Sequence, residues 1–300
     1  MFLYLDNVCY KENMIELDQI KPSLKIECKD NTPLKPFIRW AGGKQNLISE
    51  LSSQIPKTKF KNYFEPFLGA GSLFLFNNFS NGYLSDINPH LINSYLSIQS
   101  SADDVYNRLV FHKSKLSKEY YYELRSTFNA EKDKFTIDQA AVFIFLVHTS
   151  FNGIYRVNKK GEYNVPFGKI KPAIPSHEHL LQIKKKLEKI ELRNCMYEDV
   201  LDKIAKHDFV YFDPPYPPLN ETSFFQHYSI DKFPSIQQIE LSEYANELDK
   251  RGVYVMISNA ETPLIRNLYS GWNIKKVSTY RYVNCKAERK IVNELILTNY

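Results

Sequence analysis

The chain has 300 residues, a net charge of +5 at pH 7 and 43% hydrophobic residues, enough apolar material for a large folded core. It contains no run of 18 apolar residues, so we expect no membrane-spanning helix and no membrane partner. The four cysteines, Cys9, Cys28, Cys195 and Cys285, form no Cys-x-x-Cys pair. This pattern predicts reduced thiols in a cytoplasmic protein and no metal site.

The first third of the chain begins with an extension and continues as alternating strands and helices. Residues 1–34 mix acidic residues and lysines, and we expect a peripheral segment there. Tyr63–Glu65 is predicted to be a short buried strand, and Gly82–Ser85 a second strand that ends at Asp86. Pro89 is predicted to lie in the first turn of the next helix, where its missing amide proton is not needed.

The middle of the chain, from about Ser101 to Leu192, is predicted to consist of helices and loops. Thr136 opens a capping-box pattern, and the apolar run 140–147 behind it indicates a buried helix. Residues 105–190 contain 16 Lys or Arg and 8 Asp or Glu, a local balance of +8. Such an excess suits contact with a phosphate backbone, and a solvated lysine-rich surface would explain it equally well.

The last third returns to strands and helices. Residues 208–212 and 253–257 are predicted strands on either side of a helix over 236–250, and residues 272–281 and 291–298 are two more. In the helix the residues expected on one face are Ile236, Leu241, Tyr244, Ala245 and Leu248. The alternation predicts an α/β fold with a doubly wound sheet, divided by the helical insertion.

A glycine-containing turn follows the first strand, in the sequence Glu65-Pro66-Phe67-Leu68-Gly69-Ala70-Gly71. Glycines between a strand and a helix let a ligand approach the backbone closely. Asp86, 15 residues after Gly71, can accept hydrogen bonds from both hydroxyls of a ribose. The third glycine of the dinucleotide fingerprint is missing. A nicotinamide oxidoreductase is therefore a distant alternative, and two glycines also fit an ordinary tight turn.

The most specific motif is Asp213-Pro214-Pro215-Tyr216, which directly follows an apolar strand. Its two prolines fix the backbone and remove two amide donors. The carboxylate of Asp213 and the carbonyl of Pro214 can then accept both protons of one amino group, while Tyr216 offers a flat face to a base. Held in this way, the amino group becomes pyramidal and directs its lone pair at a methyl sulfonium. The alternative is a proline-rich loop without function.

In the order and spacing of its motifs the chain resembles the Dam-type DNA adenine methyltransferases of the alpha group, in which Asp-Pro-Pro-Tyr comes last. The resemblance covers about Leu34 to Tyr300 and is carried by residues 36–44, 63–71 with 86–88, 151–169 and 208–228. It implies a Rossmann-like methyltransferase core in residues 35–100 and 193–300. It also implies a DNA-recognition domain in residues 101–192.

The same resemblance implies S-adenosyl-L-methionine as the cofactor. The implied binding residues are Trp40, Ala41, Gly42, Lys44, Glu65, Phe67, Gly69, Gly71, Asp86, Ile87 and Asp213. Trp40 and Ile87 would lie near the adenine of the donor, Asp86 at its ribose and Lys44 near its carboxylate. The residues by themselves would instead suggest that Trp40 is a core aromatic and Lys44 a solvated lysine.

Residues 151–169 combine aromatic, amide and cationic side chains with loop-forming glycines. Arg can grip guanine and Asn can read adenine in the major groove, and an aromatic ring can wedge into the base stack and help to expel a base. The resemblance implies that Arg156 reads a base and Arg39 reaches a flanking guanine. Asn158, Asn164 and Lys169 would contact phosphate. The full expected DNA-binding set is Arg39, Phe151, Asn152, Ile154, Arg156, Asn158, Asn164 and Lys169. A surface hairpin with incidental basic residues is the alternative.

Together these patterns predict a DNA adenine methyltransferase that flips adenine out of double-stranded DNA and methylates its N6 amino group within GATC. We expect a monomer or weak dimer of bacterial or phage type. A restriction endonuclease of the same specificity would be a partner if the protein belongs to a restriction-modification system. The alternatives are a cytosine amino methyltransferase, which usually has Ser at position 213, an RNA or protein-glutamine methyltransferase, which commonly has Asn there, and a catalytically silent DNA-binding regulator.

Overall fold

The computed structural model describes residues 33–168, 173–216, 233–282 and 289–300. They belong to one compact unit, which begins at Asn31. The expected N-terminal extension, residues 1–34, therefore lies almost wholly outside the described residues. No helix within the described ranges is long and apolar enough to cross a membrane.

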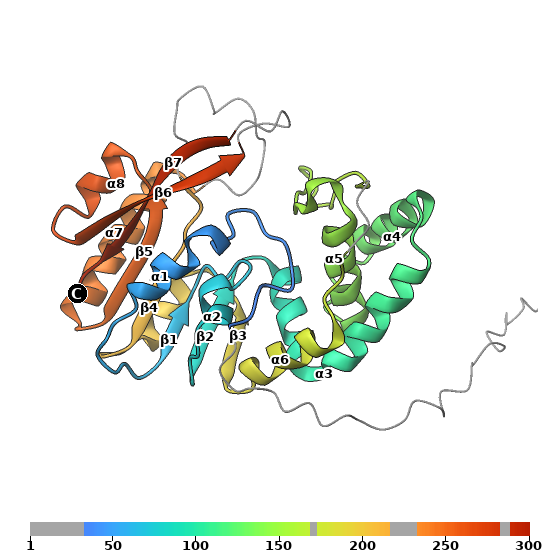
Figure 1. The fold of residues 1–300 in the computed structure, drawn as a ribbon, viewed down its shortest axis with the longest axis horizontal. Coiled ribbons are helices and arrows are strands. Elements are labelled where there is room, and N and C mark those ends of the chain that lie inside the picture. The colour runs from blue at the N-terminus through green and yellow to red at the C-terminus, as the bar shows by residue number, and fades with distance from the viewer. Residues whose placement is uncertain (1–32, 169–172, 217–232, 283–288) are drawn as a thin grey trace, which may run out of the picture. The chain divides into compact units, whose positions relative to one another are not determined.

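A seven-stranded sheet forms the centre of this unit, in the order β3-β2-β1-β4-β5-β7-β6 (Figure 1). The first five strands in this order run parallel, while β7 runs antiparallel between β5 and β6. The strands are β1 Tyr63–Glu65, β2 Gly82–Asp86, β3 Ile190–Asn194, β4 Phe209–Phe212, β5 Tyr254–Ala260, β6 Asn273–Tyr282 and β7 Arg289–Thr298. This confirms the predicted doubly wound α/β fold.

The central strands explain where a ligand site can form. β1 and β4 are buried along their whole length, as expected for parallel strands that are covered on both faces. The strand order reverses between them, because β2 and β3 continue on the side of β1 while β5 continues on the side of β4. Ligands of open α/β sheets bind outside the carboxyl ends of the strands at such a reversal. The glycine turn and Asp213 both follow strands that end here.

The helices fall into two groups. Around the sheet lie the short helix η1 Gln45–Leu47, α1 Ile48–Ser53, α2 Ser72–Phe76, η3 Glu198–Lys203, α7 Ser235–Lys250 and α8 Pro263–Leu268. The helical portion between β2 and β3 consists of α3 Pro89–Ser114, α4 Lys118–Ala130, α5 Ile137–Thr149, η2 Phe151–Gly153 and α6 His177–Leu187 (Figure 1). α3 belongs to both regions, and its backbone leaves helical geometry at Ser101.

The start of α3 is the one that the sequence predicts. Pro89 occupies its first turn, and the side chain of Asn88 accepts hydrogen bonds from the backbone amides of His90 and Leu91, at 3.0 and 3.1 Å. These contacts satisfy amide groups that have no partner within the helix. The strand β2 and the helix α3 are thereby joined by a short, well-capped turn, which places Asp86 at the carboxyl edge of the sheet.

Two details of the predicted helices are corrected. The N-cap of α5 is confirmed, because the hydroxyl of Thr136 accepts a hydrogen bond from the amide of Gln139. The side chain of Gln139 does not complete the capping box, however, but donates to the carbonyl of Glu131. In α7 Ile236 is 57% exposed, so its predicted place on one face with Leu241, Ala245 and Leu248 was wrong. The buried stripe is Gln238, Leu241, Ala245 and Leu248, and Ile236 points away from it because successive helical residues turn by about 100°.

Candidate functional site

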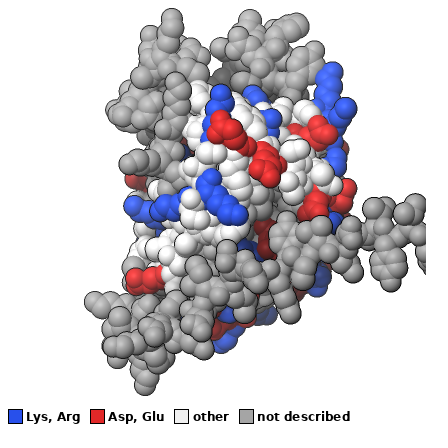
Figure 2. All heavy atoms as spheres, turned by 90° about the vertical axis from the view of Figure 1, so that its right-hand side faces the viewer, with Lys and Arg blue, Asp and Glu red and all other residues white. Residues whose placement is uncertain are grey.

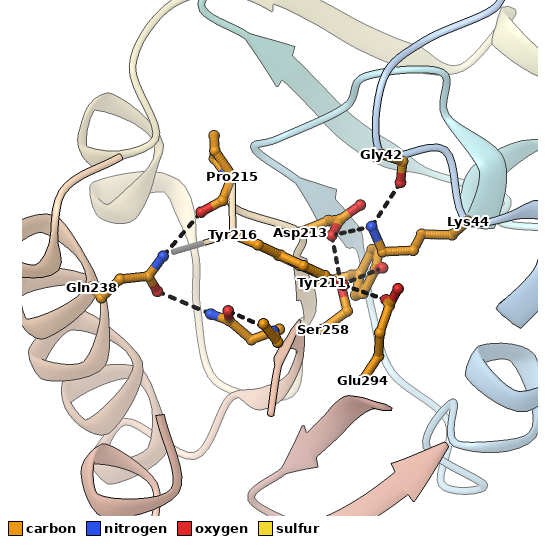
Figure 3. A network of polar contacts seen from close by, with 11 residues as sticks. Gly42, Lys44, Tyr211, Asp213, Pro215, Tyr216, Gln238, Ser258 and Glu294 are labelled. Carbon is orange, nitrogen blue, oxygen red and sulfur yellow. Dashed lines mark hydrogen bonds and ion pairs between the residues drawn. The ribbon is translucent and has the colours of Figure 1, made fainter. Parts of the chain in front are cut away.

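Asp213 follows β4 and presents a carboxylate whose two oxygens differ. Its Oδ1 atom lies 2.8 Å from the Nζ atom of Lys44 and accepts a hydrogen bond of 2.7 Å from the hydroxyl of Ser258 on β5. Its Oδ2 atom points away from both groups (Figure 3) and has no partner within the described part of the chain. Burial raises the pKa of Asp213, while Lys44 and Ser258 oppose this shift. The site therefore holds one carboxylate oxygen in place and leaves the other as an acceptor.

Lys44 is buried in the centre of this network, with 7% of its side chain exposed. Its Nζ atom also donates to the carbonyl of Gly42, at 2.7 Å, and lies 4.7 Å from the centre of the Tyr216 ring. The backbone of Gly42 has a φ of +80°, which favours glycine in this turn, and Ala41 beside it is exposed. The ammonium group thus stabilises the ionised form of Asp213.

Tyr216 is held at its far end by a residue that sequence reasoning missed. Its hydroxyl donates a hydrogen bond of 2.7 Å to the Oε2 atom of Glu294 on β7, and Glu294 is only 5% exposed. Burial, Asp213 and Glu294 together raise the pKa of Tyr216 well above its usual value, so the phenol is neutral at physiological pH. An acidic residue next to the apolar run Leu295–Leu297 is the one signal in the sequence that could have indicated this contact.

The backbone of the motif is fixed by a buried chain of hydrogen bonds that starts at α7 (Figure 3). The side chain of Gln238 donates to the carbonyl of Pro215 at 3.0 Å and accepts at 2.9 Å from Asn259, whose own oxygen accepts from the amide of Ala260. Both amide side chains are fully buried. The carbonyl of Pro215 is thus engaged by α7 and fixed in its orientation.

The glycine turn and Asp86 form the neighbouring part of the same sheet edge. The Oδ2 atom of Asp86 accepts from the amide of Gly69 and its Oδ1 atom from the amide of Asn88, both at 2.9 Å. Gly69 and Gly71 have φ values of +50° and +63°, which favour glycine. A Cβ atom at Gly71 would lie 2.6 Å from the hydroxyl of Tyr95. Both the turn conformation and its packing therefore require glycine at position 71.

Two exposed apolar side chains follow the ends of β2 and β3 at this edge of the sheet. Ile87, directly after Asp86, is 65% exposed, and Met196, in the loop after β3, is 45% exposed. The side chain of Asn194 donates to the carbonyls of Asp86 and Ile87, at 2.9 Å each, and so ties the ends of β2 and β3 together. A carboxylate and exposed apolar side chains thus lie at the same edge of the sheet.

Two other residues expected at the cofactor take part in packing. Glu65 is buried at the end of β1 and accepts a hydrogen bond of 2.9 Å from the hydroxyl of Tyr63, and burial raises its pKa. The ring of Phe67 stacks on Tyr197 with 5.1 Å between the ring centres and also contacts the ring of Phe233. No group of three or more His, Cys, Asp or Glu side chains that could hold a metal ion occurs in the described ranges.

Residues 39–44 connect this edge to the expected DNA-recognition block. The indole of Trp40 stacks on Tyr155, with 5.3 Å between ring centres and 15° between planes, and lies against Gly69. The side chain of Arg39 lies against Gly153, where an added Cβ atom would come within 2.5 Å of its Cδ atom. Arg39 is therefore brought next to residues 151–169, and its expected contact with a flanking guanine stays a prediction.

The recognition block presents Phe151 outward at the end of α5. Its side chain is 46% exposed, and the following Asn152 adopts a left-handed backbone with φ +60°. Ile154 is half-buried and packs against the hydrophobic core. Lys169, the last residue of the expected set, lies outside the described residues. Phe151 and Asn152 are thus placed where an approaching duplex could reach them.

The hairpin that follows uses three of the expected DNA-binding side chains internally. The Nε atom of Arg156 donates to the side-chain oxygen of Asn164, at 2.8 Å. The side chain of Asn158 accepts from the amides of Lys160 and Glu162 and donates to the carboxylate of Glu162. Arg156 and Asn164 are thus brought together as a pair, whereas the amide of Asn158 is occupied within the turn.

The hairpin is held by α4, through contacts that sequence reasoning missed. The side chain of Asn129 donates to the carbonyl of Tyr163 and accepts from its amide, at 3.0 and 2.8 Å, and the hydroxyl of Tyr121 donates to the carbonyl of Val165 at 2.9 Å. On the face drawn in Figure 2, basic and acidic side chains lie next to each other. The positive excess of the middle segment is not gathered into one patch among the residues coloured there.

Comparisons with known proteins point to a single family. The family model for D12 class N6 adenine-specific DNA methyltransferases matches residues 40–283. A type II methyltransferase of Methanocaldococcus jannaschii is 37% identical over 287 residues, which cover 89% of this chain and 99% of that protein. The DNA adenine methylase of Escherichia coli K12 is 35% identical over 266 residues, covering 87% of this chain and 94% of that protein. A solved precorrin-6y C5,15-methyltransferase of Geobacter metallireducens aligns over 85% of this chain and 88% of that chain. With 8% identity and a TM-score of 0.38 it is too distant to support an argument.

Proposed function

Because the chain belongs to the D12 class N6 adenine-specific DNA methyltransferases, we propose that it acts at a specific site in double-stranded DNA and flips the target adenine out of the helix. It is an enzyme that methylates the N6 amino group of adenine in DNA, and S-adenosyl-L-methionine is its methyl donor. The single observation that carries the proposed mechanism is the carboxylate of Asp213, whose Oδ1 atom is held by Lys44 and Ser258 while its Oδ2 atom is left as an acceptor near Tyr216.

When bound, S-adenosyl-L-methionine supplies an electrophilic methyl group. The residues that would hold it fit a nucleoside, since the carboxylate of Asp86 and the exposed side chain of Ile87 lie together beside the glycine turn. Lys44 offers a positive charge for a carboxylate group, and it is already part of the network that includes Asp213.

The acceptor pair acts on the amino group of the target adenine. The Oδ2 atom of Asp213 and the carbonyl of Pro214 would accept its two protons, which concentrates the nitrogen lone pair on the side of the methyl group. Tyr216 would stack on the extruded base. This is catalysis by positioning and electrostatic stabilisation, which requires no covalent enzyme intermediate.

For the recognition site we propose GATC, on the resemblance of residues 151–169 to the readers of that sequence. Arg39 and Arg156 would grip guanine bases, because a guanidinium can donate to two guanine acceptors in the major groove. Phe151 would enter the base stack next to the target. Arg156 is already paired with Asn164, which would hold its guanidinium in one orientation. Residues 101–192 are the DNA-recognition domain in this proposal, and residues 35–100 and 193–300 carry catalysis.

The decisive experiment is transfer of labelled methyl from S-adenosyl-L-methionine to two duplexes that are identical except that one GATC is scrambled. Label in the GATC duplex alone supports the proposed site. Label in both duplexes would leave the enzyme class and overturn the site, and label in neither would require a different recognition sequence. Digestion of the product to nucleosides shows whether adenine or cytosine carries the methyl group, which separates this proposal from a cytosine amino methyltransferase.

The type II methyltransferases of Methanocaldococcus jannaschii and Lactococcus lactis among the relatives favour a role as the modification enzyme of a restriction-modification system. A restriction endonuclease with the same specificity would then be the functional partner. Plasmid from cells that express the protein should resist a GATC-cutting endonuclease that is blocked by N6 methylation of adenine. Full sensitivity of a saturated plasmid would contradict the GATC site, and the role would then require a partner endonuclease of another specificity.

A further inference from the structure

Glu294 is a buried carboxylate that directly precedes an apolar run in β7. It lies on β7 before Leu295, Ile296 and Leu297, which are all buried. Burial of a carboxylate is unfavourable unless hydrogen bonds or opposite charges compensate it. Its Oε2 atom accepts the hydroxyl of Tyr216 at 2.7 Å, so part of the compensation comes from the catalytic motif itself.

The register of the sheet explains why these groups meet. Ser258 on β5 is paired with Ile296 on β7, and Tyr211 on β4 is paired with Met256 on β5. Because side chains alternate between the two faces of a strand, Tyr211, Ser258 and Glu294 project from the same face of three neighbouring strands. Asp213 continues this row immediately after β4, and Tyr216 lies over it (Figure 3).

We propose that Glu294 is a positioning residue for the methyl transfer, which acts by fixing the orientation of the Tyr216 ring. This inference rests on the proposed stacking of the target adenine on that ring. The backbone before the ring is held by Gln238 through the carbonyl of Pro215, at 3.0 Å. The bond to Glu294 holds the opposite end, so the two torsion angles of the tyrosine side chain are fixed together. A ring fixed in this way is ready to receive the base without reordering.

A different role for Glu294 must be distinguished from this one. Its charge lies in the same network as Lys44 and Asp213, so it could act on the donor site or on the acceptor carboxylate directly. A role through the Tyr216 hydroxyl predicts that the two residues depend on each other. A direct electrostatic role predicts independent effects, because the charge would remain when the hydroxyl is removed.

The test is a double-mutant cycle with Glu294→Ala, Tyr216→Phe and the double variant, assayed for kcat and KM with a GATC duplex. Each single variant should lower kcat by about ten- to hundredfold, the range for a hydrogen bond to a charged group, and the double variant should be no worse than the poorer single one. Glu294→Gln should retain most of the activity, because its amide oxygen can still accept the hydroxyl. Fluorescence of 2-aminopurine at the target position gives a second readout, and quenching by the stacked ring should weaken in Glu294→Ala.

Glu261 provides the matched control. It lies one residue beyond β5 at the same end of the sheet and pairs with Arg266 and Lys276, so Glu261→Gln removes a charge without touching Tyr216 and should leave kcat unchanged. The inference would be overturned if the loss of kcat in the double variant equalled the product of the two single losses, or if 2-aminopurine quenching were unchanged in Glu294→Ala. The proposed function would stand in either case. A wild-type enzyme that methylates no adenine in any duplex would overturn the proposed function, and the inference with it.

Discussion

At the scale of single residues, the proposed chemistry depends on how the two oxygens of Asp213 are used. Oδ1 is fixed by Lys44 and Ser258, and Oδ2 would serve, with the Pro214 carbonyl, as the proposed acceptor pair. The variant Asp213→Asn keeps the shape and an acceptor for Ser258 but removes the negative charge. Its kcat should fall by about 10²–10³-fold, as when one preorganised electrostatic group is lost, while DNA affinity in a gel-shift assay changes little. Preserved turnover would refute the assignment of the acceptor pair.

Lys44 should control the pH range in which Asp213 works. Burial raises the pKa of this carboxylate, and Lys44 opposes that rise. Protonation of Asp213 removes the acceptor, so kcat should decline as the pH falls through this pKa. In Lys44→Met the opposing charge is absent, and the acidic limb of the kcat profile should move to higher pH. An unchanged limb, measured with saturating donor and DNA, would show that another group sets it.

The motifs Asp213–Tyr216 and Gly69–Gly71 were recognisable in the sequence because each is a local pattern. The resemblance also placed Lys44 at the site, but its ion pair with Asp213 across 169 positions and the bond of Glu294 to Tyr216 across 78 positions were not predictable. In the sequence, Glu294 and Gln238 look like ordinary polar residues of a strand and a helix. Only the register of β7 beside β5 and the start of α7 place them at the site.

At the scale of elements, the alternation of strands and helices was predictable, whereas the faces of individual helices were less so. The buried side of α7 begins with Gln238, a polar residue that hydrophobic periodicity passes over, and the exposed Ile236 took its place in the prediction. The apolar α5 was correctly predicted to be buried. It packs in the helical portion beside α3, where two histidines are buried as well.

The buried histidines of α3 should make the helical portion sensitive to acid. Burial lowers the pKa of His90 and His112 to about 4, well below the usual value near 6.5. Between about pH 6.5 and 4 the unfolded chain binds protons that the folded chain does not. The free energy of unfolding therefore decreases as the pH is lowered, by up to about 1.4 kcal/mol per pH unit for each histidine. Urea unfolding at several pH values should show this decline.

The variant His90→Phe tests the origin of this decline. His90 packs against the rings of Phe128, Phe135 and Phe143, at 4.8, 5.7 and 5.6 Å between ring centres, and its Nδ1 atom has no hydrogen-bond partner among the described residues. A phenyl ring therefore fits the site without the loss of a hydrogen bond. The acid dependence of the free energy of unfolding should become shallower in this variant. An identical slope would mean that other groups are responsible.

At the scale of the whole enzyme, residues 39–44 contact all three parts on which the proposed reaction depends. Arg39 lies against Gly153 in the recognition block, Trp40 against Gly69 in the glycine turn, and Lys44 on Asp213. These contacts join residues that are far apart in the sequence, which is why the short pattern around Trp40 suggested a core aromatic when read by itself. The stack of Trp40 on Tyr155 is the direct link between the recognition block and the donor side.

This link predicts that a change in the recognition block alters donor binding without DNA. In Tyr155→Leu the indole of Trp40 loses its stacked partner and keeps only the edge contact with Phe143. The dissociation constant of S-adenosyl-L-methionine, measured by calorimetry, should therefore rise about two- to tenfold, the value of one aromatic pair. Tyr155→Phe keeps the ring and should bind the donor normally. Phe151→Ala removes an exposed ring that does not contact Trp40, so it should leave donor affinity unchanged and reduce only methylation of DNA. Equal donor affinity in Tyr155→Leu and the wild type would mean that the stack supports the recognition block alone.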